Sequence, residues 1–117
     1  MEVKWTDLIK LDESGVSRIN KVAGVYRISH YDNDGKYYVH YVGQASDLNS
    51  RLNQHLYGNE VNVCCNKYLK NYTCYFKACS ISNQSDRDSA EVALYNHFKP
   101  DCVEKIPDVK PIDINFD

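Results

Sequence analysis

A β-hairpin near the start of the chain constrains its fold more than any other feature of the sequence. Residues 24–31 (GVYRISHY) and 36–42 (KYYVHYV) are rich in valine, isoleucine and tyrosine, which favour β-strands. Residues 32–35 (DNDG) separate them, and their Asp-Gly pair suits the positive φ angles of a tight turn. The sequence therefore predicts two antiparallel strands joined directly by this turn.

A helix is predicted directly after the hairpin. Ser46 or Asp47 can cap its start, and Gly58 is its expected end. Arg51 and His55 are four residues apart, so they share one face of this helix, one turn from each other. Leucines also recur every four residues and form the expected buried stripe: Leu48, Leu52 and Leu56.

The second half of the chain predicts two more helices and a third strand. Residues 61–71 indicate a short helix and residues 72–81 a strand. A final helix is expected from Ser85 or Asp86 to about Phe98, and Pro100 terminates it. This order predicts a small α/β (α+β) domain in which helices flank a three-stranded antiparallel sheet, the hairpin plus one strand.

A chain of 117 residues fits one domain. We divide it into an N-terminal docking segment (1–22), a core (23–103) and an acidic extended tail (104–117). Trp5 is the expected anchor of the first segment on the core. The end of the tail is expected to form an edge strand or an extended arm.

Composition limits the classes of protein that fit the chain. No apolar run approaches the roughly 18 residues of a membrane span, and the first residues lack a signal-peptide pattern. We therefore expect a cytoplasmic protein without membrane association. The five cysteines form no C-x-x-C pair, so we expect free thiols rather than a zinc site or a disulfide framework. The net charge of −2 does not by itself indicate nucleic acid as a partner.

Five features, taken in order, resemble the GIY-YIG endonuclease family. Residues 24–26 (GVY) and 41–43 (YVG) stand where that family has Gly-Ile-Tyr and Tyr-Ile-Gly on its two hairpin strands. Arg51 and His55 match the arginine and the histidine or tyrosine that its next helix presents. Glu91 matches the single metal-binding glutamate of a later helix that ends before a proline. The resemblance covers roughly residues 22–103, which would then be the catalytic core.

The residue types suit phosphodiester hydrolysis without the resemblance. Arg51 carries a permanently charged planar fork that can hold two phosphate oxygens. Glu91 offers hard oxygen ligands suited to Mg²⁺ or Mn²⁺, which would act on the scissile phosphate and the leaving group. Because only one carboxylate is implied, we expect one divalent ion that keeps several water ligands.

The resemblance also implies roles for the other matching residues. Tyr26 and Tyr41 are expected near the attacking water, and Tyr26 is the favoured general base. His55 could position the water, share the base role or contact the phosphate, and the sequence does not choose among these. Gly24 and Gly43 are expected to allow close backbone approach at the site. The expected nucleic-acid contacts are Gln44, Lys67 and Lys70.

The chain departs from the family pattern at three points. Val103 stands where the family often has an asparagine after the proline, and Gln44 stands where excision-repair members have a lysine. The spacing from Tyr26 to Tyr41 is longer than usual, which we attribute to extended strands around the turn.

These observations predict a metal-dependent endonuclease that cuts nucleic acid, DNA in preference to RNA, with low sequence specificity. A homodimer or a recognition partner would be one source of specificity. The alternative is a nucleic-acid-binding or partner-binding module on the same fold with little catalysis.

Overall fold

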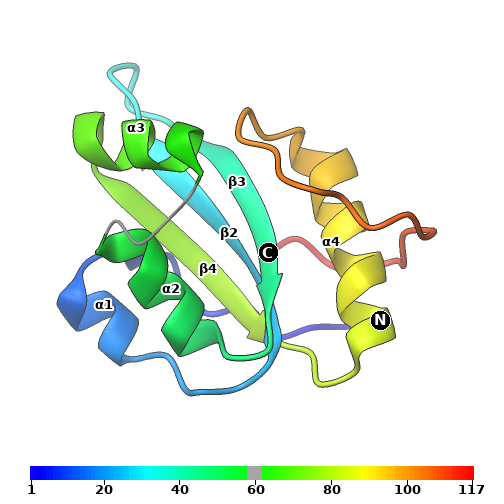
Figure 1. The fold of residues 1–117 in the computed structure, drawn as a ribbon. Coiled ribbons are helices and arrows are strands. Elements are labelled where there is room, and N and C mark those ends of the chain that lie inside the picture. Colours follow the sequence, from blue (N-terminus) through cyan, green and yellow to red (C-terminus); the bar gives the residue numbers. More distant parts are fainter. Residues whose placement is uncertain (58–61) are drawn as a thin grey trace.

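The computed structural model describes residues 1–57 and 62–117, and Figure 1 shows its fold. In these ranges the elements along the chain are β1 (Ile9–Lys10), α1 (Glu13–Ser17), β2 (Gly24–Tyr31), β3 (Tyr37–Ala45), α2 (Leu48–Leu56), α3 (Val63–Asn71), β4 (Cys74–Ser80) and α4 (Gln84–Phe98). The α/β (α+β) class and the predicted hairpin are confirmed. Two predictions fall partly outside the described residues. They are the start of the helix predicted over residues 61–71 and the end, at Gly58, of the helix predicted before it.

The sheet has four strands in the order β1-β4-β2-β3, and each neighbouring pair is antiparallel. The prediction of three strands was therefore wrong by one. The missed strand, β1, has two residues, Ile9 and Lys10, which pair with Phe76 and Tyr75 of β4. A strand this short cannot show the alternation of apolar and polar residues by which strands are recognised.

Helices cover both faces of the sheet. Helices α1, α2 and α3 lie on one face, and α4 lies on the other (Figure 1). Alternation along β2 divides the core accordingly, because successive side chains point to opposite faces. Tyr26 and Ile28 pack with Leu52 of α2, whereas Val25 packs with Leu94 of α4.

The register of the hairpin places two tyrosines on one face of the sheet. Tyr26 pairs with Gly43 and Ile28 with Tyr41, and the register then shifts so that Ser29 pairs with Val39. Strand β3 therefore contains one extra residue at this point, which is a β-bulge. The bulge accounts for part of the long spacing between Tyr26 and Tyr41.

Side-chain caps fix the helices beside the sheet. Asp47 caps α2 by accepting a hydrogen bond from the amide of Ser50, as predicted. For α4 the cap is Asn83, not Ser85 or Asp86, and it accepts from the amide of Asp86 at 3.0 Å. Asn83 was missed because several consecutive polar residues there can all act as caps.

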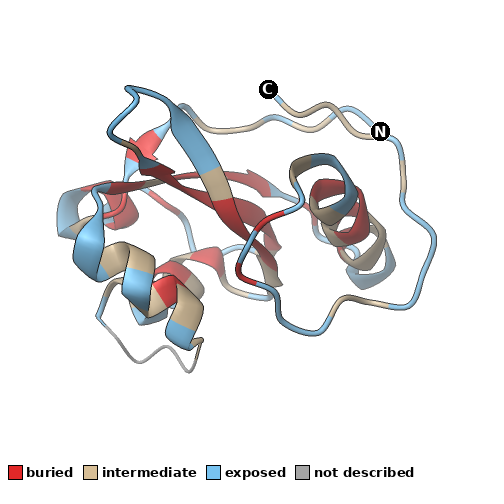
Figure 2. Ribbon diagram, turned by 90° about the horizontal axis from the view of Figure 1, so that it is seen from above, coloured by how far each residue is buried: buried red, intermediate tan, exposed pale blue. Residues whose placement is uncertain are grey.

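The two ends of the chain lie side by side on the α4 face (Figure 2). The tail is extended and pairs with the N-terminal segment through Asn115, whose Oδ1 accepts from the amide of Val3 at 2.8 Å. The indole of Trp5 donates to the carbonyl of Asn115 at 2.9 Å, and the guanidinium of Arg27 lies over the Trp5 ring. Trp5 thus anchors the first segment, and the tail forms an extended arm rather than a strand.

The prediction of five free thiols was wrong. Cys64 of α3 and Cys102 after α4 form a disulfide with a Cα–Cα distance of 5.5 Å. The free cysteines in the described part of the chain are buried: Cys65, Cys74 and Cys79. The two bonded cysteines are 38 residues apart, and sequence spacing alone does not reveal such a pairing.

No helix within the described ranges is long and apolar enough to cross a bilayer.

Candidate active site

Three buried rings meet beneath α2. Tyr26 and Tyr41 come from the paired strands β2 and β3, and His55 comes from the last turn of α2. The hydroxyl of Tyr26 and Nε2 of His55 are 2.8 Å apart and share a hydrogen bond. The ring centroid of His55 lies 5.5 Å from that of Tyr26 and 5.0 Å from that of Tyr41. The hairpin and α2 therefore bring together three of the predicted catalytic residues.

Gly43 makes room for this cluster. A Cβ atom at Gly43 would lie 2.7 Å from the hydroxyl oxygen of Tyr26, closer than such contacts occur in proteins, and 3.0 Å from Cε2 of Tyr41. Gly24 serves a different contact, since a Cβ atom there would lie 2.1 Å from the carbonyl oxygen of Cys79 in β4. Gly43 thus shapes the site itself, whereas Gly24 permits the packing of the central strands.

Arg51 lies at the exposed side of the rings. Its Nη2 donates to the hydroxyl of Tyr41 at 3.4 Å, and its Nη1 donates to Oε1 of Gln54 at 3.1 Å. Its side chain is 22% exposed and forms an ion pair with Glu104 at 3.6 Å. A carboxylate from the tail thus contacts the cation that was predicted to hold phosphate.

Glu91 lies across the edge of the sheet on α4, in a group of polar side chains. The pKa of its carboxyl is raised to about 7, mainly by burial and also by nearby Asp88 and Glu104, while a hydrogen bond from Gln44 opposes the rise. Gln44 also donates to Oδ1 of Asp88 at 2.7 Å. The side-chain amide of Gln44 therefore orients the acidic groups of α4.

Glu104 connects the two halves of the site. Its charge raises the pKa of Glu91 on α4, and it also adds to the rise that burial causes in the pKa of Tyr41. Since Glu104 pairs with Arg51 as well, the α2 residues and Glu91 border one region at the edge strand β3. The resemblance alone placed these residues on separate helices, and the fold brings them together.

Burial also sets the protonation of the ring cluster. The pKa of His55 is lowered to about 3, first by burial and then by the charges of Arg51 and His40, so its imidazole is neutral at neutral pH. The pKa of Tyr41 is raised by burial and by Glu104, against the smaller opposing effects of Arg51 and Tyr26. The hydroxyl of Tyr41 thus stays protonated, whereas neutral His55 can accept a hydrogen bond from the hydroxyl of Tyr26.

The donor set at Glu91 fits a single hard divalent ion. Its carboxyl is partly exposed and lies near two further carboxylates, Asp88 and Glu104, so a cation would relieve an acidic neighbourhood. Among the residues that the structure describes, no group of three or more histidine, cysteine, aspartate or glutamate side chains could hold a metal ion. An ion at Glu91 would therefore take most of its ligands from water and substrate.

In the part of the chain that the structure describes, two predicted contacts form no bond to this region, and two residues of the region were not predicted: Asp88 and Glu104. Lys67 and Lys70 are exposed on α3, so their predicted role with nucleic acid stays a prediction. Asp88 lies one helical turn before Glu91, and that spacing was a usable signal. Glu104 gave no such signal, because it reaches the site through the path of the tail.

Comparison with known proteins identifies the family. The family model described as GIY-YIG catalytic domain matches residues 22–114. No curated protein matches the chain significantly.

Solved structures of similar fold include the GIY-YIG N-terminal endonuclease domain of UvrC from Thermotoga maritima. Its magnesium-bound form is 18% identical in sequence, with a TM-score of 0.55, over 77% of this chain and 96% of that chain. A tyrosine-to-phenylalanine mutant bound to the catalytic divalent cation is 17% identical, with a TM-score of 0.57, over 80% and 99%. At these identities the likeness concerns the fold.

The family match extends over well more than half of the chain and includes every element that carries the candidate site. The chain therefore belongs to the GIY-YIG catalytic domain family and is an endonuclease domain, an enzyme that hydrolyses phosphodiester bonds.

Proposed function

We propose that this domain is a metal-dependent endonuclease that cuts DNA with low sequence specificity. The observation that carries the proposal is the 2.8 Å bond between Tyr26 and the neutral imidazole of His55, with Arg51 one helical turn away. Glu91 borders the same region from α4. This arrangement offers a proton acceptor, a phosphate clamp and a metal ligand, the three functions that phosphodiester hydrolysis needs.

Arg51 is the residue that would hold the scissile phosphate. Its fork can donate two parallel hydrogen bonds to phosphate oxygens, and its charge would stabilise the negative charge that develops during the reaction. Arg51 now pairs with Glu104, so phosphate must compete with this carboxylate for the guanidinium. That pair is partly exposed, and such pairs contribute about 0.2–1 kcal/mol, so a phosphodiester that accepts two hydrogen bonds from the guanidinium can displace it.

Tyr26 is the residue that would remove the proton from the attacking water, with His55 as its partner. His55 can hold and orient the hydroxyl of Tyr26 by accepting its hydrogen bond through Nε2, because the imidazole is neutral and within 2.8 Å. Tyr41 is less suited to this role because its pKa is raised. Its hydroxyl accepts a hydrogen bond from Arg51, so we assign it to positioning that side chain.

Glu91 would hold one Mg²⁺ or Mn²⁺ ion, with Gln44 keeping the carboxyl in place. The UvrC domain structures are described as bound to the catalytic divalent cation, magnesium in one of them. When bound, such an ion supplies charge stabilisation at the phosphate and the leaving oxygen. Glu91 must be ionised to bind the ion, and this requires loss of the proton that burial favours.

The choice of DNA over RNA follows the family resemblance. The cytoplasm as the site of action also stays a prediction, and the disulfide offers a test of it. In a reducing cytoplasm Cys64 and Cys102 would be thiols, which thiol labelling of protein from its native cells would detect. The mass of the complex that the domain forms with a DNA duplex would reveal whether it binds as a homodimer or together with a recognition partner.

The first experiment is cleavage of supercoiled plasmid DNA with Mg²⁺ or Mn²⁺ by the domain and its Glu91→Ala variant. We expect nicking or linearisation that disappears in Glu91→Ala. It should persist in the control variant Glu2→Ala, which changes an exposed glutamate far from Glu91 in the sequence. Labelled DNA and RNA duplexes of one sequence, cut in parallel, test the preference for DNA.

Three outcomes would contradict the proposal. Equal cutting by Glu91→Ala would mean that the metal ligand is misassigned. Faster cutting of RNA would overturn the choice of substrate. If nothing is cut under any condition, the alternative of a binding module on this fold would be favoured.

A further inference from the structure

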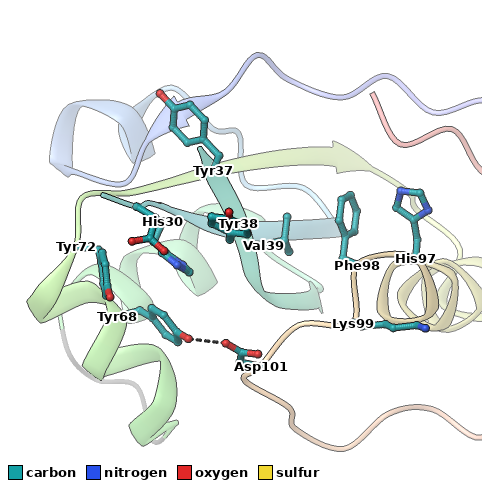
Figure 3. Close-up of a pocket in the computed structure, with 11 residues that line it drawn as sticks. His30, Tyr37, Tyr38, Val39, Tyr68, Tyr72, His97, Phe98, Lys99 and Asp101 are labelled. Atoms are coloured by element: carbon teal, nitrogen blue, oxygen red, sulfur yellow. Dashed lines mark hydrogen bonds between the residues drawn. The ribbon is translucent and has the colours of Figure 1, made fainter. Parts of the chain in front are cut away.

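An aromatic groove of about 550 Å³ lies beside the candidate site and has no role in the chemistry proposed above. Figure 3 shows it between α3, which contributes Tyr68 and is followed by Tyr72, and the end of α4, which contributes Phe98. Tyr38 of β3 and His30 of β2 lie between these helices. We call these five residues the aromatic groove. Its volume falls within the roughly 300–1,000 Å³ of ligand pockets.

Rings of the aromatic groove pack against one another, and two of them are exposed. His30 lies 4.5 Å from Tyr68 between centroids, and the two planes differ by 26°. Tyr38 stacks against His30 from the other strand, with centroids 5.9 Å apart. Tyr38 is 42% exposed and Tyr72 is 36% exposed, so these two tyrosines remain accessible to a ligand. Exposed tyrosine rings of this kind suit a flat π system that stacks on them.

The charges of the groove do not suit phosphate. Asp32 and Asp101 line it against a single lysine, Lys99, among the lining residues. The pKa of His30 is lowered, mainly by burial, so its imidazole adds no positive charge near neutral pH. A neutral, planar group that can donate hydrogen bonds to carboxylates fits this lining, and nucleobases have these properties.

The groove and the candidate site are close along the chain and in space. The hydroxyl of Tyr68 donates to Asp101 at 2.6 Å, and Glu104, three residues later, pairs with Arg51. Three residues span at most about 11 Å between Cα atoms, and the side chains of Asp101, Glu104 and Arg51 add their own lengths. A base in the groove would therefore lie within a few nucleotides of a phosphate at Arg51.

We propose that the aromatic groove binds one unstacked nucleobase of the substrate strand, close to the phosphate that Arg51 holds. This inference rests on the proposed function, because it names the class of DNA that the site prefers. A base in a regular duplex is stacked and cannot enter, so the enzyme selects DNA with an unpaired or extruded nucleotide near the cut.

The test has a binding arm that needs no catalysis. A fluorescent single-stranded oligonucleotide is titrated without divalent metal against the domain, Tyr38→Ala, Tyr72→Ala and Tyr31→Ala. Tyr31 is 45% exposed on the same hairpin and does not line the groove, so it is the matched control. We expect about tenfold weaker binding for each groove variant, as removal of one stacking ring causes, and unchanged binding for the control. Melting temperatures of all variants establish that they are folded.

The cleavage arm compares duplexes of one sequence that differ at a single position. One duplex is fully paired, one has an unpaired nucleotide and one has an unpaired abasic sugar there. We expect the wild-type domain to cut the second about tenfold faster than the first. The abasic duplex should lose this preference, and so should the Tyr38→Ala and Tyr72→Ala variants.

The outcomes separate this inference from the proposed function. Metal-dependent cutting with no preference for the unpaired nucleotide would overturn the role of the groove and leave the nuclease assignment intact. Groove-dependent binding by a domain that cuts nothing would support the groove and contradict the proposed function. Equal binding by Tyr38→Ala, Tyr72→Ala and Tyr31→Ala would overturn the groove as a base-binding site.

Discussion

At the scale of single residues, the hydroxyl of Tyr26 is the atom on which the proposed chemistry depends most. Replacement of Tyr26 by Phe removes the hydroxyl that bonds to His55 and leaves the buried ring in place. We expect cleavage to fall about 10²–10⁴-fold, the usual contribution of a general base, with little change in melting temperature. Plasmid cleavage and thermal unfolding measure the two effects. Tyr31→Phe, an exposed tyrosine of the same strand, should cut as the wild type does.

Glu91 gives the site a pH dependence whose sign is set by its raised pKa of about 7. The carboxyl is neutral below this pH and binds metal only after it loses its proton. The Mg²⁺ concentration for half-maximal cleavage should therefore rise about tenfold for each pH unit below 7 and level off above it. A constant requirement for Mg²⁺ between pH 5.5 and 8 would contradict the assignment of Glu91 as the ligand.

The same pKa links Glu91 to stability. Because the folded-state pKa is raised, the neutral carboxyl favours folding, and this benefit is lost as pH rises through about 7. Without metal, Glu91→Gln should gain melting temperature relative to the wild type between pH 6 and pH 8.

At the scale of elements, the hairpin and α2 could be predicted because their signals are local. The bounds of β2 follow from its valine, isoleucine and tyrosine content, and Asp47 caps α2 as expected. Strand β1 could not be predicted, because two residues carry no periodicity and form a strand only by pairing with β4. The bulge in β3 is likewise a property of the strand pair.

The residues of the candidate site can also be divided into those that the sequence predicts and those that it does not. Motif residues within the hairpin and α2 could be assigned from sequence, and the structure places Tyr26, Tyr41 and His55 in one cluster. The contact of Gln44 with nucleic acid stays a prediction, and sequence reasoning missed that its amide bonds to the acidic side chains of α4. The ion pair of Arg51 with Glu104 depends on the path of a segment without regular structure, and local patterns do not encode such a path.

The segment after α4 should weaken substrate binding through Glu104, because this carboxylate pairs with Arg51. In Glu104→Gln the ion pair with Arg51 is lost and phosphate no longer competes with a carboxylate, so KM should fall by up to about fivefold. The pH midpoint of metal activation should also move down, because Glu104 contributes to the raised pKa of Glu91. Steady-state cleavage across pH measures both effects. Asp108→Asn, an exposed acidic residue of the same tail, should change neither of them.

At the scale of the whole molecule, the disulfide joins α3 to the segment that follows α4. It closes a loop of 38 residues in the unfolded chain, for which chain entropy predicts a stabilisation of about 3–4 kcal/mol. Addition of a reductant should therefore lower the melting temperature by roughly 15 °C. The Cys64→Ser/Cys102→Ser variant should melt at the lower temperature with or without reductant. A wild-type melting temperature that reductant does not change would show that the bond does not stabilise the fold.

The pairing of the two chain ends has a consequence for how the connectivity of this domain can be changed. The amide of Val3 and the indole of Trp5 both bond to Asn115, so the ends lie together on the α4 face. A short linker could join them, and new ends could be opened at the exposed turn of residues 32–35. Such a circular permutant would keep every strand pairing of the sheet. It would show that the site depends on the arrangement of the elements and not on the order in which the chain visits them.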